Sequence, residues 1–355
     1  MKLFKCSHCG QLIYFENTHC EQCGLQLGFE TESLELVALN ADNNGLFKIQ
    51  GKNTNQRYRY CANYQHTVCN WLVPENNDSF FCKACDLNRT IPDLRNAEYV
   101  QEWKTIETAK HRLVYSLLRM KLPLVSKTIN EETGLAFDFI ADTNLPKAEK
   151  ILTGHDNGLI TINIAEADDI KREMARKSMQ EVYRTVLGHF RHEIAHYYWD
   201  RLIADTNKTQ AFRSLFGDEN LDYEKALKTH YEQGPPTDWQ KNFISSYAST
   251  HPWEDWAETW AHYMHIIDTL ETAYAFGLSI GPRGQHTSDS LQAEIKTDPY
   301  RVSDFEKIIQ LWLPLTFAMN SLNRSMGLND LYPFVISPPV IKKMKFIHAV
   351  IGEYS

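Results

Sequence analysis

The sequence predicts an α+β protein, in which a mainly helical domain with a small sheet follows two compact cysteine-rich modules. Two observations lead to this prediction. All eight cysteines lie between Cys6 and Cys85, and none falls in the 270 residues that follow. Beyond the cysteines, apolar residues recur at helical spacing in several long segments, and a few short β-type runs stand between them. We expect domains over residues 1–30, 31–95 and 96–355.

Composition excludes several classes of protein. A chain of 355 residues that is 43% hydrophobic and 12% aromatic is typical of a folded protein with a sizeable core. The formal charge of -8, with nine Lys and Arg against ten Asp and Glu through residue 95, argues against a nucleic-acid surface. No run approaches the roughly 18 to 20 apolar residues of a membrane span, and none precedes the first cysteine pair. We therefore expect no membrane partner and a cytoplasmic location.

The first four cysteines form two pairs with metal-ligand spacing. The pairs are Cys6-x2-Cys9 and Cys20-x2-Cys23, separated by ten residues and followed by Gly10 and Gly24. Such knuckles can close a tetrahedral site of four thiolates around zinc, and glycine permits the positive φ that the knuckle turn needs. Two disulfides are the alternative, but they would require an oxidising compartment.

The second cysteine cluster is less regular. Residues 31 to 60 contain short β-type runs, and the ligands Cys61, Cys69, Cys82 and Cys85 follow with spacings of seven, twelve and two residues. His66 could replace Cys69, although four thiolates are the simpler set for a structural zinc ion. The modules either stabilise a segment too small to bury its own core or also dock a protein partner.

A helix predicted from Tyr183 to Leu202 carries the sequence HEIAH. At 3.6 residues per turn, His192 and His196 lie on one helical face and can bind one metal ion. Glu193 is turned about 100° from His192, where a carboxylate can accept a proton without being a ligand. The pattern is short enough to arise by chance in an ordinary helix.

The third ligand must come from elsewhere, because position 202, where a third histidine would continue the motif, is Leu202. A second predicted helix begins near Pro252 and extends to about residue 276. It places Glu254 in its first turn, where the helix dipole favours a carboxylate, and Glu258 one turn later on the same face. Glu258 can hold a ligand imidazole in the correct tautomer.

The pairing of HEIAH with SYASTHPWEDWAE resembles the gluzincin metallopeptidases, in particular the lethal-factor-type proteases. In those proteases a tyrosine precedes the zinc-binding glutamate by seven residues, and a second glutamate follows four later. Tyr247, Glu254 and Glu258 match that spacing. The whole chain is also similar to a family of zinc-binding metallopeptidases with an N-terminal zinc ribbon. The resemblance implies a zincin-like domain over residues 96–355.

The resemblance also implies roles for individual residues. His192, His196 and Glu254 would hold one catalytic zinc ion, in addition to the two structural ions. Glu193 would take a proton from a zinc-bound water, and Tyr247 would donate to the oxyanion. In such folds the strand before the metal helix often lies at the cleft edge, where a substrate can add as another strand. Residues 159–165 are the candidate, with an ordinary buried strand as the alternative.

We therefore expect a zinc-dependent peptidase acting on a peptide or protein. Two alternatives stay open. One is a zinc-ribbon adaptor that binds protein or nucleic acid and keeps an inactive peptidase-like domain; the other is a zinc hydrolase that does not cut peptides. Residues 206 to 239 separate the two halves of the metal site and could form a wall of the substrate pocket. His230 lies in this segment, facing either the pocket or solvent.

Overall fold

The computed structural model describes residues 2–53, 55–142, 153–178, 184–283 and 291–354, and it confirms the predicted α+β class. The chain forms two compact units. The N-terminal unit comprises Lys2–Tyr115 and Leu124–Ala175, and the C-terminal unit comprises Ser116–Pro123 and Arg176–Ser355. Each unit is described separately below.

The N-terminal unit begins with the strand pair β1 (Phe4–Lys5) and β2 (Leu12–Ile13). A five-stranded antiparallel sheet follows, in the order β3-β4-β5-β6-β7. Its strands are β3 (Leu27–Glu30), β4 (Glu35–Ala41), β5 (Phe47–Ile49), β6 (Tyr58–Tyr60) and β7 (Leu72–Pro74). The predicted β-type runs of residues 31 to 60 therefore lie in this sheet, whose apolar side chains form a small core.

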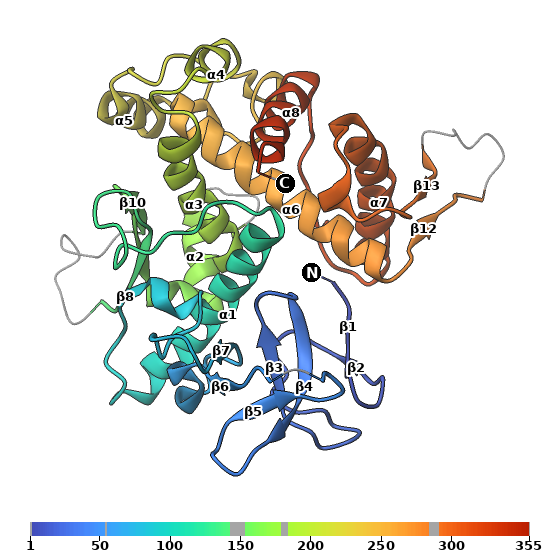
Figure 1. Ribbon diagram of the computed structural model, residues 1–355. Coiled ribbons are helices and arrows are strands. Elements are labelled where there is room, and N and C mark those ends of the chain that lie inside the picture. Colours follow the sequence, from blue (N-terminus) through green and yellow to red (C-terminus); the bar gives the residue numbers. More distant parts are fainter. Residues whose placement is uncertain (1, 54, 143–152, 179–183, 284–290, 355) are drawn as a thin grey trace. The chain divides into compact units, whose positions relative to one another are not determined.

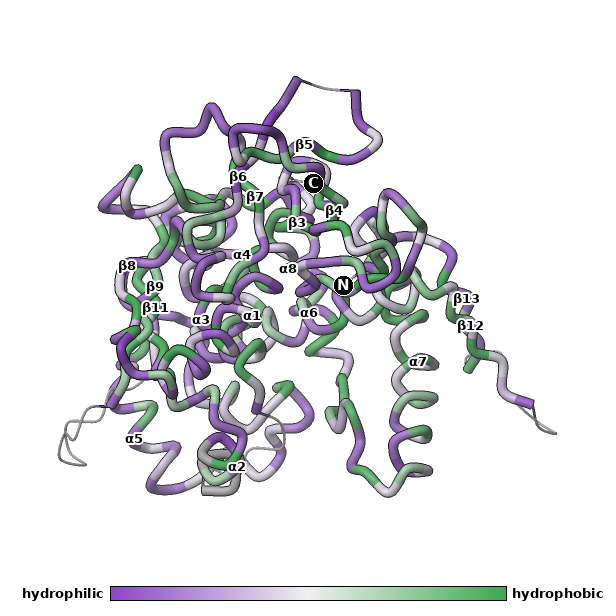
Figure 2. Tube along the Cα trace, turned by 90° about the horizontal axis from the view of Figure 1, so that it is seen from below, coloured by the Kyte–Doolittle hydropathy of each residue, from purple (hydrophilic) through white to green (hydrophobic). Residues whose placement is uncertain are grey.

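A second sheet in the same unit has the order β10-β11-β9-β8. Its strands are β8 (Asn88–Thr90), β9 (Ala136–Ile140), β10 (Gly154–Asp156) and β11 (Leu159–Asn163). Strand β9 runs parallel to both β8 and β11, and β10 pairs antiparallel with β11. The central strands β9 and β11 are largely hydrophobic along their length (Figure 2).

Of the two alternatives for residues 159–165, the position of β11 favours the buried strand over the edge strand. Strand β11 pairs with β10 on one side and with β9 on the other. It is therefore an interior strand of its sheet, paired with β9 along its length and with β10 over residues 159–161, and not an edge that is open to a further strand. The strand also ends at Asn163, because the Asn163 side chain accepts a hydrogen bond from Ala165 N and starts a 3-10 turn.

Helix α1 (Ala97–Arg119) follows the first two groups of strands in the N-terminal half of the chain, and its residues through Tyr115 belong to the N-terminal unit. Helix α2 (Asp169–Ser178) follows the second sheet. The C-terminal unit contains α3 (Val186–Leu202), α4 (Thr209–Phe216), α5 (Tyr223–Gln233), α6 (Pro252–Ala275), α7 (Phe305–Ser325), α8 (Pro338–Gly352), and the strand pair β12 (Ser279–Ile280) and β13 (Ala293–Glu294). Among the residues described, no helix is both long and apolar enough to cross a membrane.

Helix α6 is the centre of the C-terminal unit. It packs against α3, α4, α7 and α8 (Figure 1). It buries residues on nearly every side. Its start is set by His251, whose Nδ1 accepts a hydrogen bond from Trp253 N, and by Pro252 in the first turn. Helix α3 is joined to it where the Trp256 indole donates to the Ala195 carbonyl at 2.9 Å.

Helix α3 begins at Val186, later than the predicted Tyr183, which lies outside the described residues. Thr185 caps it, and its hydroxyl accepts a hydrogen bond from Gly188 N at 3.0 Å. The side chains that face α6 are buried, among them Ile194, Ala195 and Tyr198. Burial of this face fixes the direction in which the remaining residues of α3 point.

Candidate active site and metal centres

Three side chains from α3 and α6 bring their ligand atoms together. His192 and His196 stand one turn apart on α3, and their Nε2 atoms are 3.3 Å from each other. Glu254, in the first turn of α6, places Oε2 3.0 Å from His192 Nε2 and 3.8 Å from His196 Nε2. All three atoms lie within 4.8 Å of one another. The arrangement can hold one cation with two imidazoles and one carboxylate.

The surroundings of Glu254 fit a metal ion. Glu254 is 2% exposed, and its Oε2 accepts no hydrogen bond among the described residues. A buried carboxylate oxygen without a partner is costly unless a cation neutralises it. Zinc–nitrogen bonds of about 2.0 to 2.1 Å in a tetrahedron place two nitrogens about 3.3 Å apart, as the two imidazoles here are. The donor set therefore suits zinc.

Glu258 fixes the tautomer of His192. The carboxylate Oε1 lies 2.8 Å from His192 Nδ1, so this nitrogen carries the proton and Nε2 keeps its lone pair. Ser245 donates its hydroxyl to Glu258 Oε2 at 2.7 Å and holds the carboxylate in position. A metal-ligating histidine commonly has a carboxylate partner of this kind.

The charges in the site favour a cation at His192. Burial alone would lower the pKa of His192, but the facing carboxylates of Glu254 and Glu258 outweigh burial and raise it well above its usual range. Burial lowers the pKa of His196 to about 4, so this imidazole is neutral. Burial would raise the pKa of Glu254, but the two histidines hold it at about 2. Two carboxylates thus attract one positive charge, whether proton or metal ion.

Glu193 lies beside these ligands on α3 and is not one of them. Its carboxylate makes no hydrogen bond in the part of the chain that the structure describes. Burial raises the pKa of Glu193 to about 7, and the negative charges of Glu254 and Glu258 add to this effect. A carboxylate with a pKa near neutrality can both accept and return a proton.

Tyr247 lies at the same site, in a 3-10 turn of Tyr247–Ser249. Its ring centroid is 6.0 Å from that of His192. The neighbouring Tyr223 donates its hydroxyl to Glu254 Oε1 at 2.7 Å. Burial and the charge of Glu254 raise the pKa of both phenols, so both remain protonated donors.

Two of these residues were not predicted from the sequence. Tyr223 is the first residue of α5, in the segment expected only as a pocket wall. Its spacing from the HEIAH motif and from the segment with Glu254 does not indicate that it belongs to the site. Ser245 precedes Tyr247 by two residues, but serine is too common in loops for its position alone to indicate a role. His230, for which solvent and the pocket were both considered, packs its ring 6.1 Å from that of Tyr247.

The first cysteine centre brings its four thiols together. Cys6 Sγ lies 3.8 Å from Cys23 Sγ, and Cys9 Sγ lies 3.6 Å from Cys20 Sγ. These are the separations of sulfurs around zinc, since Zn–S bonds of about 2.3 Å give tetrahedral edges of about 3.8 Å. Each knuckle closes at a glycine with positive φ, 77° at Gly10 and 73° at Gly24.

The second cysteine centre gathers Cys61, Cys69, Cys82 and Cys85, all of them buried and none in a disulfide. Backbone amides donate to two of the sulfurs, as knuckles around zinc do, with Trp71 N and Cys82 N each 3.4 Å from its acceptor sulfur. His66 is not part of this group, and its Nε2 contacts the Gln65 side chain. A different histidine, His111 of α1, lies 3.2 Å from Cys69 Sγ.

Comparisons with known proteins agree with these features. Residues 99–350 match the family described as "Putative zinc-binding metallo-peptidase", and residues 3–96 match a zinc-ribbon domain. Uncharacterized proteins of Mycobacterium bovis and of two strains of Mycobacterium tuberculosis are each 42% identical to the chain over 354 residues. The match covers 99% of this chain and 96% of each relative. No solved structure matches the chain.

Proposed function

Because the chain belongs to this family of zinc-binding metallopeptidases and carries an N-terminal zinc ribbon, we propose that it hydrolyses peptide bonds at the centre of His192, His196 and Glu254. The convergence of these three ligand atoms beside an unbonded carboxylate, that of Glu193, carries the proposal. The chemistry is of the gluzincin type, in which two histidines of one helix and a glutamate of a second hold the ion.

The side chains around this centre have separate roles in the proposed reaction. Zinc held there would polarise the scissile carbonyl and lower the pKa of a water molecule. Glu193 accepts the proton of the attacking water and returns it to the leaving amine. Glu258, held by Ser245, keeps His192 in the tautomer that presents Nε2 to the ion. None of these roles requires a group from outside the C-terminal unit.

Tyr247 is the proposed donor to the oxyanion of the tetrahedral intermediate. Its ring centroid lies 6.0 Å from that of His192, and burial keeps its hydroxyl protonated. The hydroxyl that donates to Glu254 belongs to Tyr223. Tyr247 can therefore donate to the developing negative charge while Glu254 keeps its hydrogen bond from Tyr223.

The two cysteine centres are proposed as structural zinc sites, which brings the expected content to three ions per chain. Eight thiols suit a reducing compartment, in accord with a cytoplasmic location. The substrate is proposed to be a peptide or protein. A protein partner docked on the cysteine modules stays a secondary proposal.

Purified zinc-loaded protein tests the proposal on denatured casein and on a mixed peptide library. We expect new amino termini to appear, to stop when a chelator removes zinc, and to return when zinc is added. Absence of cleavage with full zinc content would favour an inactive adaptor. Hydrolysis of amide substrates other than peptides, with peptides left intact, would favour a different zinc hydrolase.

A further inference from the structure

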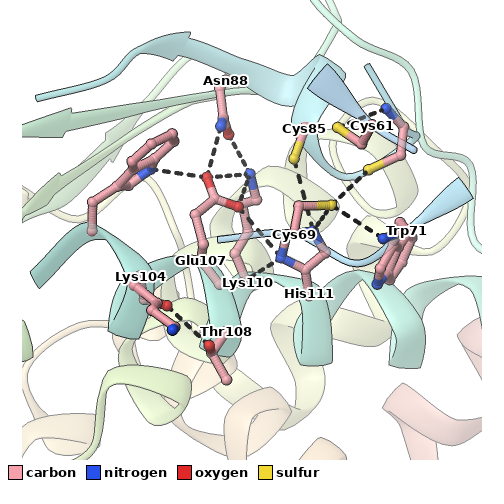
Figure 3. Close-up of polar contacts among 12 residues, drawn as sticks. Cys61, Cys69, Trp71, Cys85, Asn88, Lys104, Glu107, Thr108, Lys110 and His111 are labelled. Atoms are coloured by element: carbon pink, nitrogen blue, oxygen red, sulfur yellow. Dashed lines mark hydrogen bonds and ion pairs between the residues drawn. The ribbon is translucent and has the colours of Figure 1, made fainter. Parts of the chain in front are cut away.

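Helix α1 presents a buried polar cluster to the second cysteine centre. Trp103, Glu107, Lys110 and His111 stand on one face of the helix at spacings of four, three and one residues. Glu107 and Lys110 have no exposed surface, and His111 is 4% exposed. Figure 3 shows this face directed at Cys69 and Cys85. Charged residues are almost never buried so completely unless they are paired.

The ring of His111 has an acceptor at each nitrogen. Nδ1 lies 2.6 Å from the Glu107 carbonyl oxygen, which can only accept, so Nδ1 carries a proton. Nε2 lies 3.2 Å from Cys69 Sγ and 3.8 Å from Cys85 Sγ. Around zinc both sulfurs would be thiolates, which also accept. The ring therefore fits best with a proton on both nitrogens.

Glu107 is held by donors on several sides, as Figure 3 shows. Lys110 Nζ lies 3.0 Å from each carboxylate oxygen. Asn88 Nδ2 donates to Glu107 Oε1 at 2.7 Å, and the Trp103 indole donates to the same atom at 3.1 Å. Because Lys110 neutralises it, Glu107 is not available as a ligand for a further ion, although Cys85, Glu107 and His111 lie close together.

His111 can compensate part of the negative charge of the second zinc centre. Zinc with four thiolates carries a net charge of about -2, and burying net charge is costly unless it is compensated. The Glu107–Lys110 pair is neutral as a whole, so it offsets none of that charge. His111 is the group of α1 whose ring reaches two of the four sulfurs. The four sulfurs already complete a tetrahedron, so zinc does not need the imidazole as a ligand.

We propose that His111 is a positioning residue of the second zinc centre, donating an N–H···S hydrogen bond from α1 to the Cys69 thiolate, with the Glu107–Lys110 pair holding its ring. The centre thereby includes the first helix that follows the cysteine modules, and zinc bound there orders α1. This assignment is independent of peptidase activity, because it involves only residues of the N-terminal unit.

The test compares His111→Phe with the matched change His66→Phe. His66 lies on the same cysteine segment but outside the sulfur cluster. Both proteins are loaded with cadmium-113, which gives a separate NMR resonance for each centre, and are titrated with a chelator. We expect His111→Phe to keep a four-thiolate resonance at the second centre but to lose that metal roughly 10 to 100 times more readily, as is usual when a ligand's partner is removed. His66→Phe and the first centre should behave as in the wild type.

Two outcomes would overturn the proposal. Equal metal loss from His111→Phe and His66→Phe would mean that the hydrogen bond contributes nothing. In the wild type, a cadmium resonance at the second centre that is typical of mixed sulfur and nitrogen ligands, and not of four sulfurs, would mean that His111 is a ligand.

A second measurement needs no destabilising variant. In zinc-loaded wild type labelled with nitrogen-15 histidine, both ring nitrogens of His111 should show protonated shifts, and His111→Gln, which keeps a donor, assigns the signal. An unprotonated Nε2 would contradict the proposal. Hydrogen exchange adds a readout of α1: Cys82→Ser should raise amide exchange around Glu107 and Lys110, and unchanged exchange there would show that zinc does not order the helix.

Discussion

The Glu258 carboxylate lies 2.8 Å from Nδ1 of His192, while Nε2 of the same ring lies 3.0 Å from Glu254. One imidazole is thus held between two carboxylates of α6 that stand one turn apart. Of these two carboxylates, only that of Glu254 also approaches His196. We therefore assign Glu254 as a metal ligand and Glu258 as the hydrogen-bond partner of a ligand. Substitution of the two glutamates should separate these roles.

We predict that Glu254→Gln removes the catalytic zinc ion and leaves the cysteine-bound zinc in place. Glu258→Gln should retain the ion but weaken its affinity by roughly 10 to 100-fold, because the imidazole loses the acceptor that fixes its tautomer. Chelator competition, with elemental analysis of the protein, measures both. If Glu258→Gln empties the site and Glu254→Gln does not, the ligand assignment is one turn out of register.

The two tyrosines should also behave differently. Tyr247→Phe removes a hydroxyl that does not contact a ligand, so zinc affinity should stay unchanged while kcat falls by about 10² to 10³ with little change in KM. Tyr223→Phe removes the donor to Glu254, so zinc affinity itself should fall, by roughly 10-fold or more. Steady-state kinetics and chelator competition on both variants distinguish these effects. Wild-type rates for Tyr247→Phe would remove this residue from the mechanism.

The contrast between these tyrosines shows what spacing can predict. Tyr247, Glu254 and Glu258 fall within one short segment, so helical geometry and resemblance to a motif select them. Tyr223 reaches Glu254 only because α5 folds back onto the start of α6, a tertiary contact between residues 31 positions apart. No local period or cap encodes such a contact.

The same limit applies to the N-terminal unit. The sequence of a regular Cys-x2-Cys pair is enough to predict the geometry of its knuckle, since the knuckle is a local turn. His111 is 26 residues from Cys85 and was not predicted to lie near it. Residues 159–165 were expected to contain a strand, but the interior place of β11 depends on pairing with β9, which is distant in the sequence.

A buried ion pair behind the metal helix predicts a pH-dependent stability. Asp268 of α6 accepts hydrogen bonds from Arg191 at 2.5 Å, Ser116 at 2.8 Å and Tyr300 at 2.6 Å. Burial would raise the pKa of Asp268, but Arg191 and the two hydroxyls hold it below its usual value. A carboxylate with a lowered pKa stabilises the fold at pH values above its unfolded pKa of about 3.9.

Asp268→Asn should therefore lower the free energy of unfolding by roughly 3 to 5 kcal/mol at neutral pH, as loss of a buried partner does. The difference from wild type should shrink as the pH falls from about 4 through the lowered pKa of folded Asp268, because the unfolded carboxylate is protonated first and the folded one after it. Denaturant unfolding at a series of pH values measures this difference in the free energy of unfolding. Asp330→Asn, in an exposed pair with Arg324, is the control and should change stability little. A difference that grows on acidification would contradict the assignment.

Metal content tests the three centres together. Zinc-saturated protein should contain three ions per chain, and Cys9→Ser and Cys82→Ser should each remove one of them without affecting the catalytic ion. Elemental analysis with a thiol titration gives the counts. Fewer ions in the wild type, together with disulfides mapped between the knuckle pairs, would show that the cysteine centres do not bind zinc.

Glu193→Gln tests the central claim most directly, because Glu193 is assigned to proton transfer and to no metal contact. Glutamine has a similar size and shape but cannot accept a proton at neutral pH. Peptide cleavage by wild type and Glu193→Gln, compared at equal zinc content, is the measurement. We predict three bound ions in both proteins and a turnover in Glu193→Gln that is lower by orders of magnitude. Cleavage at the wild-type rate by the fully loaded variant would contradict this prediction.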